Sequence, residues 1–330
     1  MGTLERTPRP VFETYAAVLQ RQMDLVDPPR HTQLRRVFGK AFATAQLERL
    51  RVFTERWVET RLSSLPPSFD VLDEIARPLP FALVMELLGV PSEWRPTFDR
   101  NIEAFVAGLS DPVSKHPEVA TALVSLRDLL SAALARPELG EGSLLSIARD
   151  AIPEALSLDD LVANVILTVA AGHHTTTNLI GNGAWLLLTH HDQRTRIAAQ
   201  PHLWATAIEE MLRFESPIQT VRRVCTEAMQ LDRQQLNASD ELILMLGAAN
   251  RDRDEFERAD HFDITRTPNR HVAFGGGAHA CLGAPLARLQ ARAALGGLFA
   301  LPALRAVDAE PAWASSTAFR GLERLIVERS

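Results

Sequence analysis

Apolar residues recur at three- and four-residue spacing over most of this chain, which is the period of a helix with one buried face. Strand-like alternation is confined to segments near 222–231 and 241–248 and to the tail after residue 304, which ends in segment 325–328. No internal repeat or low-complexity linker divides the chain. It is therefore predicted to fold as one mainly α domain over residues 1–330, with small peripheral β-sheets. The predicted helices cover residues 11–27, 30–42, 45–65, 73–88, 91–109, 118–135, 157–189, 194–200, 203–214 and 285–300.

One predicted helix is much longer than the others. The 33 residues from 157 to 189 span about 50 Å at about 1.5 Å per residue. Ser157, followed by Asp159 and Asp160, fits an N-cap with an acidic first turn. Residues 170–177 at its centre read Ala-Ala-Gly-His-His-Thr-Thr-Thr, where a purely structural helix would favour Leu or Ala. This composition makes the centre of the helix a candidate for function.

Composition and charge narrow the class of protein. The 330 residues are 46% hydrophobic and 23% charged, so the chain can bury a large core and is neither disordered nor fibrous. Its 35 Lys and Arg against 41 Asp and Glu give a net charge of −6, which argues against non-specific nucleic-acid binding. No apolar run suits a membrane-spanning helix or a secretory signal. The two cysteines, Cys225 and Cys281, suit a reducing compartment, so a cytoplasmic location is predicted.

The segment 274–285, Phe-Gly-Gly-Gly-Ala-His-Ala-Cys-Leu-Gly-Ala-Pro, carries the strongest chemical signal. Its glycines permit positive φ angles and close approach of the backbone to a flat ligand, and Pro285 suits the first turn of a helix. Cys281 thus precedes a helix N-terminus, where backbone N–H groups stabilise a thiolate. The thiol can be a nucleophile, an axial metal ligand or a buried cysteine in a turn. A phosphate-binding loop is disfavoured, because no Lys-Ser or Lys-Thr follows the last glycine.

The complete pattern F-G-x-G-x-H-x-C-x-G resembles the haem-ligand loop of the cytochrome P-450 family. The resemblance implies that Cys281 is the proximal thiolate ligand of the iron of haem b and that His279 contacts a haem propionate. Cys225 matches no family position and is expected to be a small buried hydrophobic residue. The other loop positions that are expected to bind the cofactor are Phe274, Gly275 and Gly283.

Further segments match the same family in the expected order. Glu210 and Arg213 lie at i and i+3 of a predicted helix, close enough for a charge-assisted pair. Solvated helix faces often carry such pairs, but in this order the residues resemble the family's E-x-x-R, which implies a structural pair on the thiolate side of the haem. Other matches to the family's meander and tail are Asn-Arg-Asp at 250–252, His-Phe-Asp at 261–263 and Phe-Arg-Gly-Leu at 319–322.

Candidate partners for the haem propionates begin near the N-terminus. His31 and Arg35 lie one helical turn apart, and by themselves they are most simply interpreted as a polar helix face. Within the resemblance, both fall on positions that bind propionates, and Arg223 falls on a third. Together with His279 they give four cationic or hydrogen-bonding groups for two carboxylates, which suits the anchoring of a mostly apolar macrocycle.

The centre of the long helix resembles the family's A-G-x-D/E-T-T. The resemblance implies that Gly172 lets the backbone pass close to the haem, with local widening of the helix, and that Thr175 takes part in proton delivery during oxygen activation. His174 stands where the family usually has an acid. It can relay protons, shift the chemistry towards uncoupled or peroxide-dependent turnover, or be passive with its ring bonded to a backbone carbonyl.

The N-terminal region is short for this family. Only 26 residues precede Asp27, so we expect the first strands of the family's main sheet to be missing, through truncation or replacement. The segment near 241–248 is then expected to present an unpaired strand edge.

The leading hypothesis is a haem-thiolate monooxygenase of the soluble bacterial type. It is expected to insert one oxygen atom from O2 into a small apolar substrate by hydroxylation or epoxidation, and a lipid-like, terpenoid or polyketide-like compound of secondary metabolism fits best. The alternative is a P-450-like haem protein whose oxygenase activity is lost, altered or peroxide-dependent. A helical interaction module without a cofactor would leave the Cys281 loop unexplained. The segments expected to line the substrate pocket are 91–117, 165–176, 218–221 and 317–319.

Electrons are expected from a separate ferredoxin or flavodoxin, and no nucleic acid or membrane partner is expected. An acidic donor protein would dock on a basic patch. A solvated arginine-rich surface is the simpler alternative for the same residues. The candidates for the patch are Arg35, Arg36, Lys40, Arg288 and Arg292.

Overall fold

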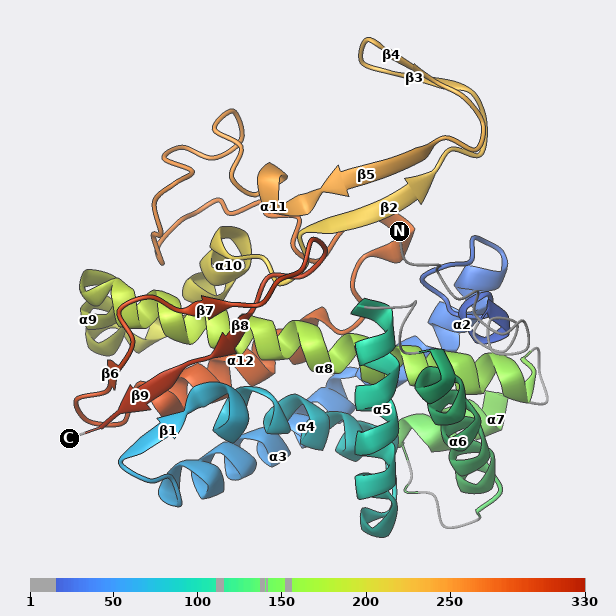
Figure 1. Cartoon of the computed structure of the whole chain (residues 1–330), viewed down its shortest axis with the longest axis horizontal. Helices are drawn as coiled ribbons and strands as arrows, with labels where there is room; N and C mark the ends of the chain where they lie inside the picture. Colours follow the sequence, from blue (N-terminus) through green and yellow to red (C-terminus); the bar gives the residue numbers. More distant parts are fainter. Residues whose placement is uncertain (1–15, 111–115, 137–139, 141, 152–155, 330) are drawn as a thin grey trace, which may run out of the picture. The chain divides into compact units, whose positions relative to one another are not determined.

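The computed structural model describes residues 16–110, 116–136, 140, 142–151 and 156–329 of the chain. Helices dominate and the strands are short, as the apolar spacing predicts (Figure 1). The helices are α2 (Arg30–Gly39), α3 (Thr44–Ser63), α4 (Pro78–Leu88), α5 (Arg95–Ser110), α6 (His116–Leu134), α7 (Leu144–Ala151), α8 (Leu158–Thr189), α9 (His191–Ala199), α10 (Trp204–Phe214), α11 (Leu246–Ala249) and α12 (Ala284–Leu298). The strands are β1 (Ser68–Asp70), β2 (Thr220–Val224), β3 (Met229–Leu231), β4 (Gln234–Leu236), β5 (Glu241–Met245), β6 (Arg305–Ala306), β7 (Ala312–Trp313), β8 (Leu322–Arg324) and β9 (Ile326–Glu328).

The chain divides into two compact units. The first comprises residues 1–57 and 78–174, and the second comprises residues 58–77 and 175–330. The boundaries fall inside α3 and α8, so each of these helices contributes residues to both units. Whether the units act as one haem-binding domain over residues 1–330 stays a prediction.

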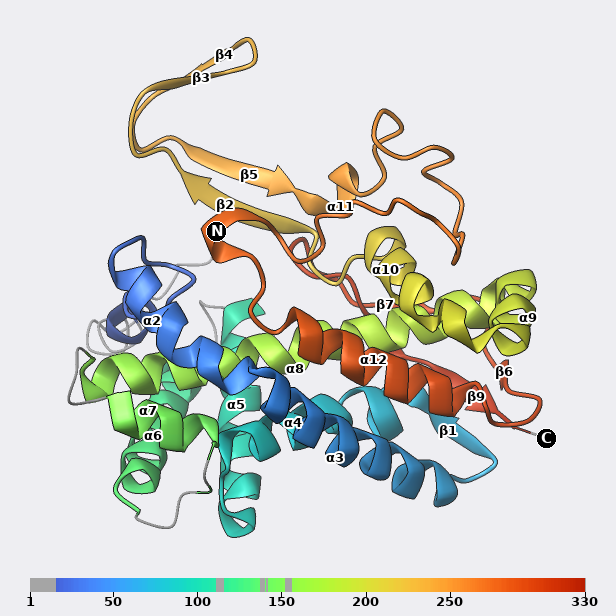
Figure 2. The same cartoon turned by 180° about the vertical axis from the view of Figure 1, so that it is seen from behind.

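In the first unit, α5 and α6 lie side by side (Figure 2). Phe98, Ile102 and Phe105 form the buried face of α5 at the three- and four-residue spacing seen in the sequence. The spacing therefore predicts both the existence of these helices and the faces that they bury. The matching buried residues of α6 are Leu123, Leu126 and Leu130.

The start of α8 is capped as the sequence predicts. The backbone N–H of Asp160 donates to Ser157 Oγ at 3.2 Å, and the N–H of Ser157 donates to Asp160 Oδ2 at 2.9 Å. This reciprocal pair satisfies two backbone donors that a helix start leaves open. Although burial by itself raises the pKa of Asp160, hydrogen bonds from Ser157 and Arg30 lower that pKa to about 2.

The segment before α2 departs from the prediction. Residues 16–19 are helical but residues 20–25 are turns, so the helix expected to reach residue 27 was wrong there, while residues 11–15 lie outside the described residues. The N–H of Met23 donates to Asn164 Oδ1 at 2.7 Å, and Asn164 Nδ2 donates to the carbonyl of Arg21 at 2.8 Å. These bonds tie the backbone to α8 and replace the helical bonds that the pattern suggested.

In the second unit, α10 packs on α12, and β1, β9 and β6 form an antiparallel sheet. Gly183 of α8 lies where these helices approach closely. A Cβ atom at Gly183 would lie 2.8 Å from both Leu295 Cδ1 and Met211 Sδ, so only glycine fits without displacement of its neighbours. The close approach anchors α8 to the helices that carry the candidate site.

Strands β2 and β5 form a two-stranded antiparallel ladder that continues into the hairpin of β3 and β4 (Figures 1 and 2). Within the described residues β5 pairs with β2 alone, so the expected unpaired edge near 241–248 is present. Ile243 and Met245 of β5 are 58% and 55% exposed. Residues 246–248 of the same predicted strand segment belong to the short helix α11 instead.

Two further local differences concern short helices. The predicted helix over 73–88 is split into a π-helical turn at Leu72–Ala76 and α4, which starts at Pro78, because proline lacks the N–H that a helix interior requires. Helix α7, only eight residues long, was not predicted. Across the described ranges, every helix falls short of the length or the apolar character that a bilayer crossing demands.

Candidate functional site

The loop that contains Cys281 has the form expected from the sequence. Gly275 and Gly277 adopt φ angles of +66° and +68°, which glycine tolerates without strain. The N–H of Cys281 donates to the carbonyl of Phe274 at 2.9 Å and closes the loop. Helix α12 follows, with Gly283 at its N-cap and Pro285 in its first turn. The cysteine therefore lies just before a helix N-terminus, where a thiolate is favoured.

This loop leaves room for a flat ligand. A Cβ atom added at Gly275, Gly276 or Gly277 would meet nothing within 4 Å, and Cys281 is exposed. The other cysteine, Cys225, is only 7% exposed and packs as a small apolar residue, as expected. Cys281 therefore lies in a loop that has open space beside its glycines.

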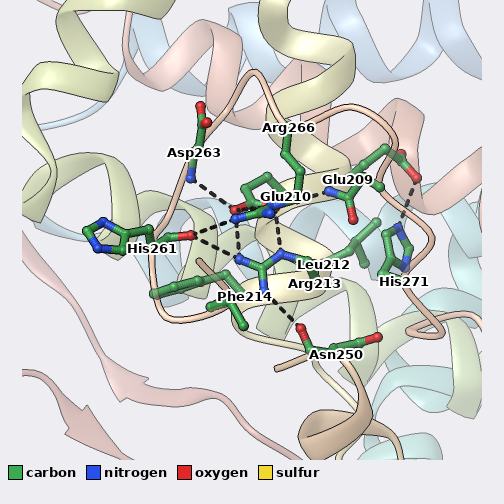
Figure 3. Close-up of polar contacts among 12 residues, drawn as sticks. Glu209, Glu210, Leu212, Arg213, Phe214, Asn250, His261, Asp263, Arg266 and His271 are labelled. Atoms are coloured by element: carbon green, nitrogen blue, oxygen red, sulfur yellow. Dashed lines mark hydrogen bonds and ion pairs between the residues drawn. The ribbon is translucent and has the colours of Figure 1, made fainter. Parts of the chain in front are cut away.

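Glu210 and Arg213 form the predicted pair on α10, and neither side chain is exposed (Figure 3). Arg213 donates from Nε and Nη2 to the two carboxylate oxygens of Glu210, each at 2.8 Å. Its remaining N–H groups donate to the carbonyls of Asn250, Ala259 and His261 at 2.8 to 3.0 Å. The pair thus holds the residue 250–261 segment on α10, which is the structural role that the sequence indicates.

Three further hydrogen-bond donors to Glu210 were not predicted. Arg266 Nε lies 3.1 Å from Glu210 Oε2, and Asn269 Nδ2 donates to the same oxygen at 3.1 Å. The N–H of Asp263 donates to Oε1 at 2.9 Å. Arg266 follows the His-Phe-Asp segment closely in sequence, which is the one signal that pointed towards it. Because two arginines surround one buried carboxylate, removal of that carboxylate would leave uncompensated positive charge.

The neighbouring residue, Glu209, faces the Cys281 loop and α12. Arg288 donates from Nε and Nη2 to its two oxygens, each at 2.7 Å, and His271 Nε2 lies 3.0 Å from Oε2. Although burial by itself raises the pKa of Glu209, hydrogen bonds from Arg288 and His271 lower that pKa to about 2. Glu209 and His271 were missed by the sequence analysis, and Arg288 was expected only as a docking residue.

The candidate propionate partners lie in different units. In the first unit, His31 of α2 is buried and Arg35, one turn later, is half-buried. In the second unit, Arg223 of β2 is exposed and His279 of the loop is half-buried. His31 and Arg35 share one helix, as the sequence predicts. The joint role of the four residues in binding the haem propionates stays a prediction.

The centre of α8 interrupts an otherwise buried helix. Residues 161–166 and 176–183 are almost all buried, whereas Ala171 and His174 are exposed and Gly172 and Thr175 are half-buried. The expected local widening was wrong, because α8 is one α-helix from Leu158 to Thr189. The stretch is thus exposed without a break in the helix.

Within the first unit, residues 172–174 have aromatic and apolar neighbours on the α4 side. The His173 ring centroid lies 6.2 Å from that of Phe81 and 6.0 Å from that of His174, in edge-on arrangements. A Cβ atom at Gly172 would lie 3.1 Å from Val84 Cγ2 of α4. The position is therefore tight on the α4 side, which favours glycine there.

Known proteins resemble this chain in both sequence and fold. The sequence model of the family described as Cytochrome P450 matches residues 128–300. A vitamin D(3) 25-hydroxylase from Pseudonocardia autotrophica is 38% identical over 92% of this chain and 77% of its own length. The crystal structure of CalO2 matches with a TM-score of 0.90 and 33% identity, over 96% of this chain and 81% of that one. A Bacillus megaterium protein, CYP109E1, solved in complex with testosterone, matches with a TM-score of 0.87 and 29% identity, over 94% and 86% of the two chains.

Proposed function

This chain belongs to the cytochrome P450 family. We propose that Cys281 is the axial thiolate ligand of its haem and that the protein oxygenates an apolar small molecule. The protein is a monooxygenase with haem b as cofactor, and it uses O2, an organic substrate and a redox partner.

The observation that carries the proposal is the geometry of the Cys281 loop. Cys281 is exposed, three consecutive glycines of its loop have open space beside them, and a helix N-terminus follows. Phe274, Gly275 and Gly283 frame this loop. Backbone N–H groups at the helix start stabilise a negative sulfur, which is the form that ligates metal. Cys225 offers no such surroundings, because it is buried beside β2.

The haem propionates are assigned to His31 and Arg35 of the first unit and to Arg223 and His279 of the second. Guanidinium and imidazole groups make charge-assisted hydrogen bonds to carboxylates. A buried His31 next to a half-buried Arg35 has the partial burial that favours such bonds over solvation.

Proton delivery is assigned to the exposed centre of α8. Bound haem supplies the redox-active iron at which O2 is reduced, with the thiolate favouring O–O cleavage. The Thr175 hydroxyl can both accept and donate a proton at Oγ1. The His174 imidazole, one residue earlier and exposed, can exchange protons with solvent near neutral pH. Gly172 has no side chain, so the helix backbone stays accessible next to His174 and Thr175.

The substrate is assigned to the class of bulky apolar molecules. Two of the expected lining segments lie side by side within the second unit, because Ile218 and Phe319 form an antiparallel bridge and Gln219 N–H donates to the Ala318 carbonyl at 2.8 Å. One relative is named a vitamin D(3) 25-hydroxylase, and one similar structure holds testosterone. Both ligands are large and mostly apolar, which fits Ile218 and Phe319 as lining residues.

A ferredoxin or flavodoxin is proposed as the electron donor. Arg36, Lys40 and Arg292 are exposed cations from the predicted basic patch, and Arg35 is half-buried. Arg288 is engaged with Glu209, so it contributes less net charge to the patch than the sequence suggests. Exposed cations steer an acidic partner mainly through the association rate. A cytoplasmic location stays a prediction.

Oxygen labelling tests the proposed reaction. Apolar compounds that shift the haem spin state are first selected, then incubated with enzyme, NAD(P)H, a surrogate ferredoxin system and 18O2. We expect one 18O atom per product molecule and none when the label is in water. Spin-state ligands that are never oxygenated, or label from water alone, would contradict the proposal.

A peroxide-dependent enzyme is the second candidate function, and His174 at the usual acid position is the observation that favours it. The same ligands incubated with hydrogen peroxide separate the two. Product with peroxide and none with the ferredoxin system would favour this alternative.

A further inference from the structure

Two consecutive carboxylates on α10 serve different partners (Figure 3). Successive helical residues point about 100° apart, so Glu209 and Glu210 cannot share one contact surface. Glu210 binds Arg213 and Arg266 in the interior. Glu209 instead binds His271, which precedes the Cys281 loop. Glu209 is therefore not part of the E-x-x-R pair and requires an explanation of its own.

The contacts of Glu209 fix its orientation closely. Arg288 approaches it with two parallel N–H···O bonds of 2.7 Å, the strongest geometry for such a pair. The N–H of Ala273 lies 3.2 Å from His271 Nδ1, so that nitrogen is an acceptor and the ring proton is on Nε2. His271 Nε2 thus donates to Glu209 at 3.0 Å.

The same network reaches the ligand cysteine. The Arg288 guanidinium lies 4.6 Å from the Phe274 ring centroid, and the Phe274 carbonyl accepts the N–H of Cys281 at 2.9 Å. Hydrogen bonding to Glu209 is the main cause that raises the pKa of Arg288. Arg288 therefore contacts the ligand loop by stacking on Phe274, and it belongs to the helix that follows Cys281.

We propose that Glu209 and Arg288 form a charge pair that sets the reduction potential of the haem bound at Cys281. The positive charge of Arg288 stabilises an added electron, while Glu209 orients Arg288 and offsets part of its charge. Both are positioning residues, because they act through the ligand loop. This inference rests on the proposed ligation by Cys281.

Removal of the negative charge and removal of the positive charge are expected to shift the midpoint potential of the haem in opposite directions. Glu209→Gln removes a negative charge, so the midpoint potential of the holoenzyme is expected to shift upwards. Its amide N–H2 must also face Arg288 or His271, which are both donors, so at least one hydrogen bond is lost. Arg288→Gln removes a positive charge and is expected to shift the potential downwards. The double variant is expected to return towards the wild-type value.

The measurement is a spectroelectrochemical titration of purified, substrate-free holoenzyme, with haem content recorded per chain. Glu328→Gln is the matched control, because it removes an exposed carboxylate paired with Arg305 on the terminal sheet. Arg288→Lys keeps the charge but not the bidentate geometry, and it is expected to stay nearer to wild type than Arg288→Gln.

Shifts of the same sign in Glu209→Gln and Arg288→Gln would overturn the proposal, because lost packing alone perturbs both alike. If Glu209→Gln fails to fold, Arg288→Gln and Arg288→Lys decide, and equal shifts in these two overturn it. The wild-type protein is first reduced and treated with CO. If it lacks the red-shifted Soret band of thiolate-ligated haem, the ligation by Cys281 fails and the inference fails with it. If the band is present and the shifts are not opposite, the inference fails alone.

Discussion

Arg213 donates hydrogen bonds to both carboxylate oxygens of Glu210, each at 2.8 Å, and neither side chain has solvent-exposed surface. Arg266 adds a second positive charge to the same carboxylate. The arrangement joins α10 to the segment that leads to the Cys281 loop, so a defect in it reaches the site through the backbone.

Glu210→Gln is expected to lower the free energy of unfolding by about 3–5 kcal/mol, because it leaves two buried or half-buried guanidinium groups without their counter-charge. Urea unfolding followed by circular dichroism measures this. The control is Asp260→Asn, which breaks an exposed pair with Arg253 in the same region. A Glu210→Gln variant as stable as that control would contradict the structural role.

Acid is expected to weaken the attachment of the 16–30 segment to α8. The pKa of Asp160 is about 2 in the folded protein, below its ordinary value of 3.8, so its contribution is complete above about pH 4. The contribution is lost as the pH falls from about 4 to 2. Asp160→Asn should lower the free energy of unfolding at pH 7 by about 1–2 kcal/mol, with allowance for solvent screening. A variant whose unfolding energy falls as steeply as wild type over that pH window would count against this.

Adjacent glycines in α12 should respond to alanine in opposite ways. A Cβ atom at Gly297 would lie 2.7 Å from Leu62 Cδ1 and 2.9 Å from Val58 Cγ1, whereas one at Gly296 comes no closer than 4.0 Å to Trp204. Gly297→Ala is expected to destabilise the protein by about 1–3 kcal/mol. Gly296→Ala is expected to stabilise it by up to about 1 kcal/mol through helix propensity. Thermal unfolding compares the two, and equal shifts of either sign would refute the packing argument.

His174 is expected to limit proton delivery. His174→Glu restores the acid found at this position in the family pattern and should raise the product formed per NAD(P)H consumed. His173→Glu is the matched control one residue away on the same helix. Coupling ratios that are unchanged in His174→Glu, or equally changed in both variants, would argue against a role for His174.

The sequence predicted those features that local residues determine. The turn at Gly275 and Gly277, the N-cap at Ser157 and the i,i+3 pair of Glu210 and Arg213 all depend on neighbours within a few positions. Periodicity likewise predicted the long helix α8, because apolar residues recur along it at three- and four-residue spacing.

Contacts between distant segments could not be predicted in the same way. Glu209 binds His271 and Arg288, which lie 62 and 79 positions later in the sequence. The spacing of residues along the chain does not predict that pairing. The apolar residues of segment 20–25 have helical spacing. Its backbone nevertheless hydrogen-bonds to the side chain of Asn164, more than 140 positions away. The regular α8 at Gly172 shows the reverse case, in which an expected distortion was absent.

The most direct test of the central claim, that Cys281 ligates the haem, uses the two cysteines of the chain as a matched pair. Wild type, Cys281→Ser and Cys225→Ser are reduced with dithionite, treated with CO and compared by difference spectroscopy. We expect the red-shifted Soret band of thiolate-ligated haem in wild type and Cys225→Ser, and its loss in Cys281→Ser. A band that persists in Cys281→Ser, or that is absent from wild type, would contradict that claim.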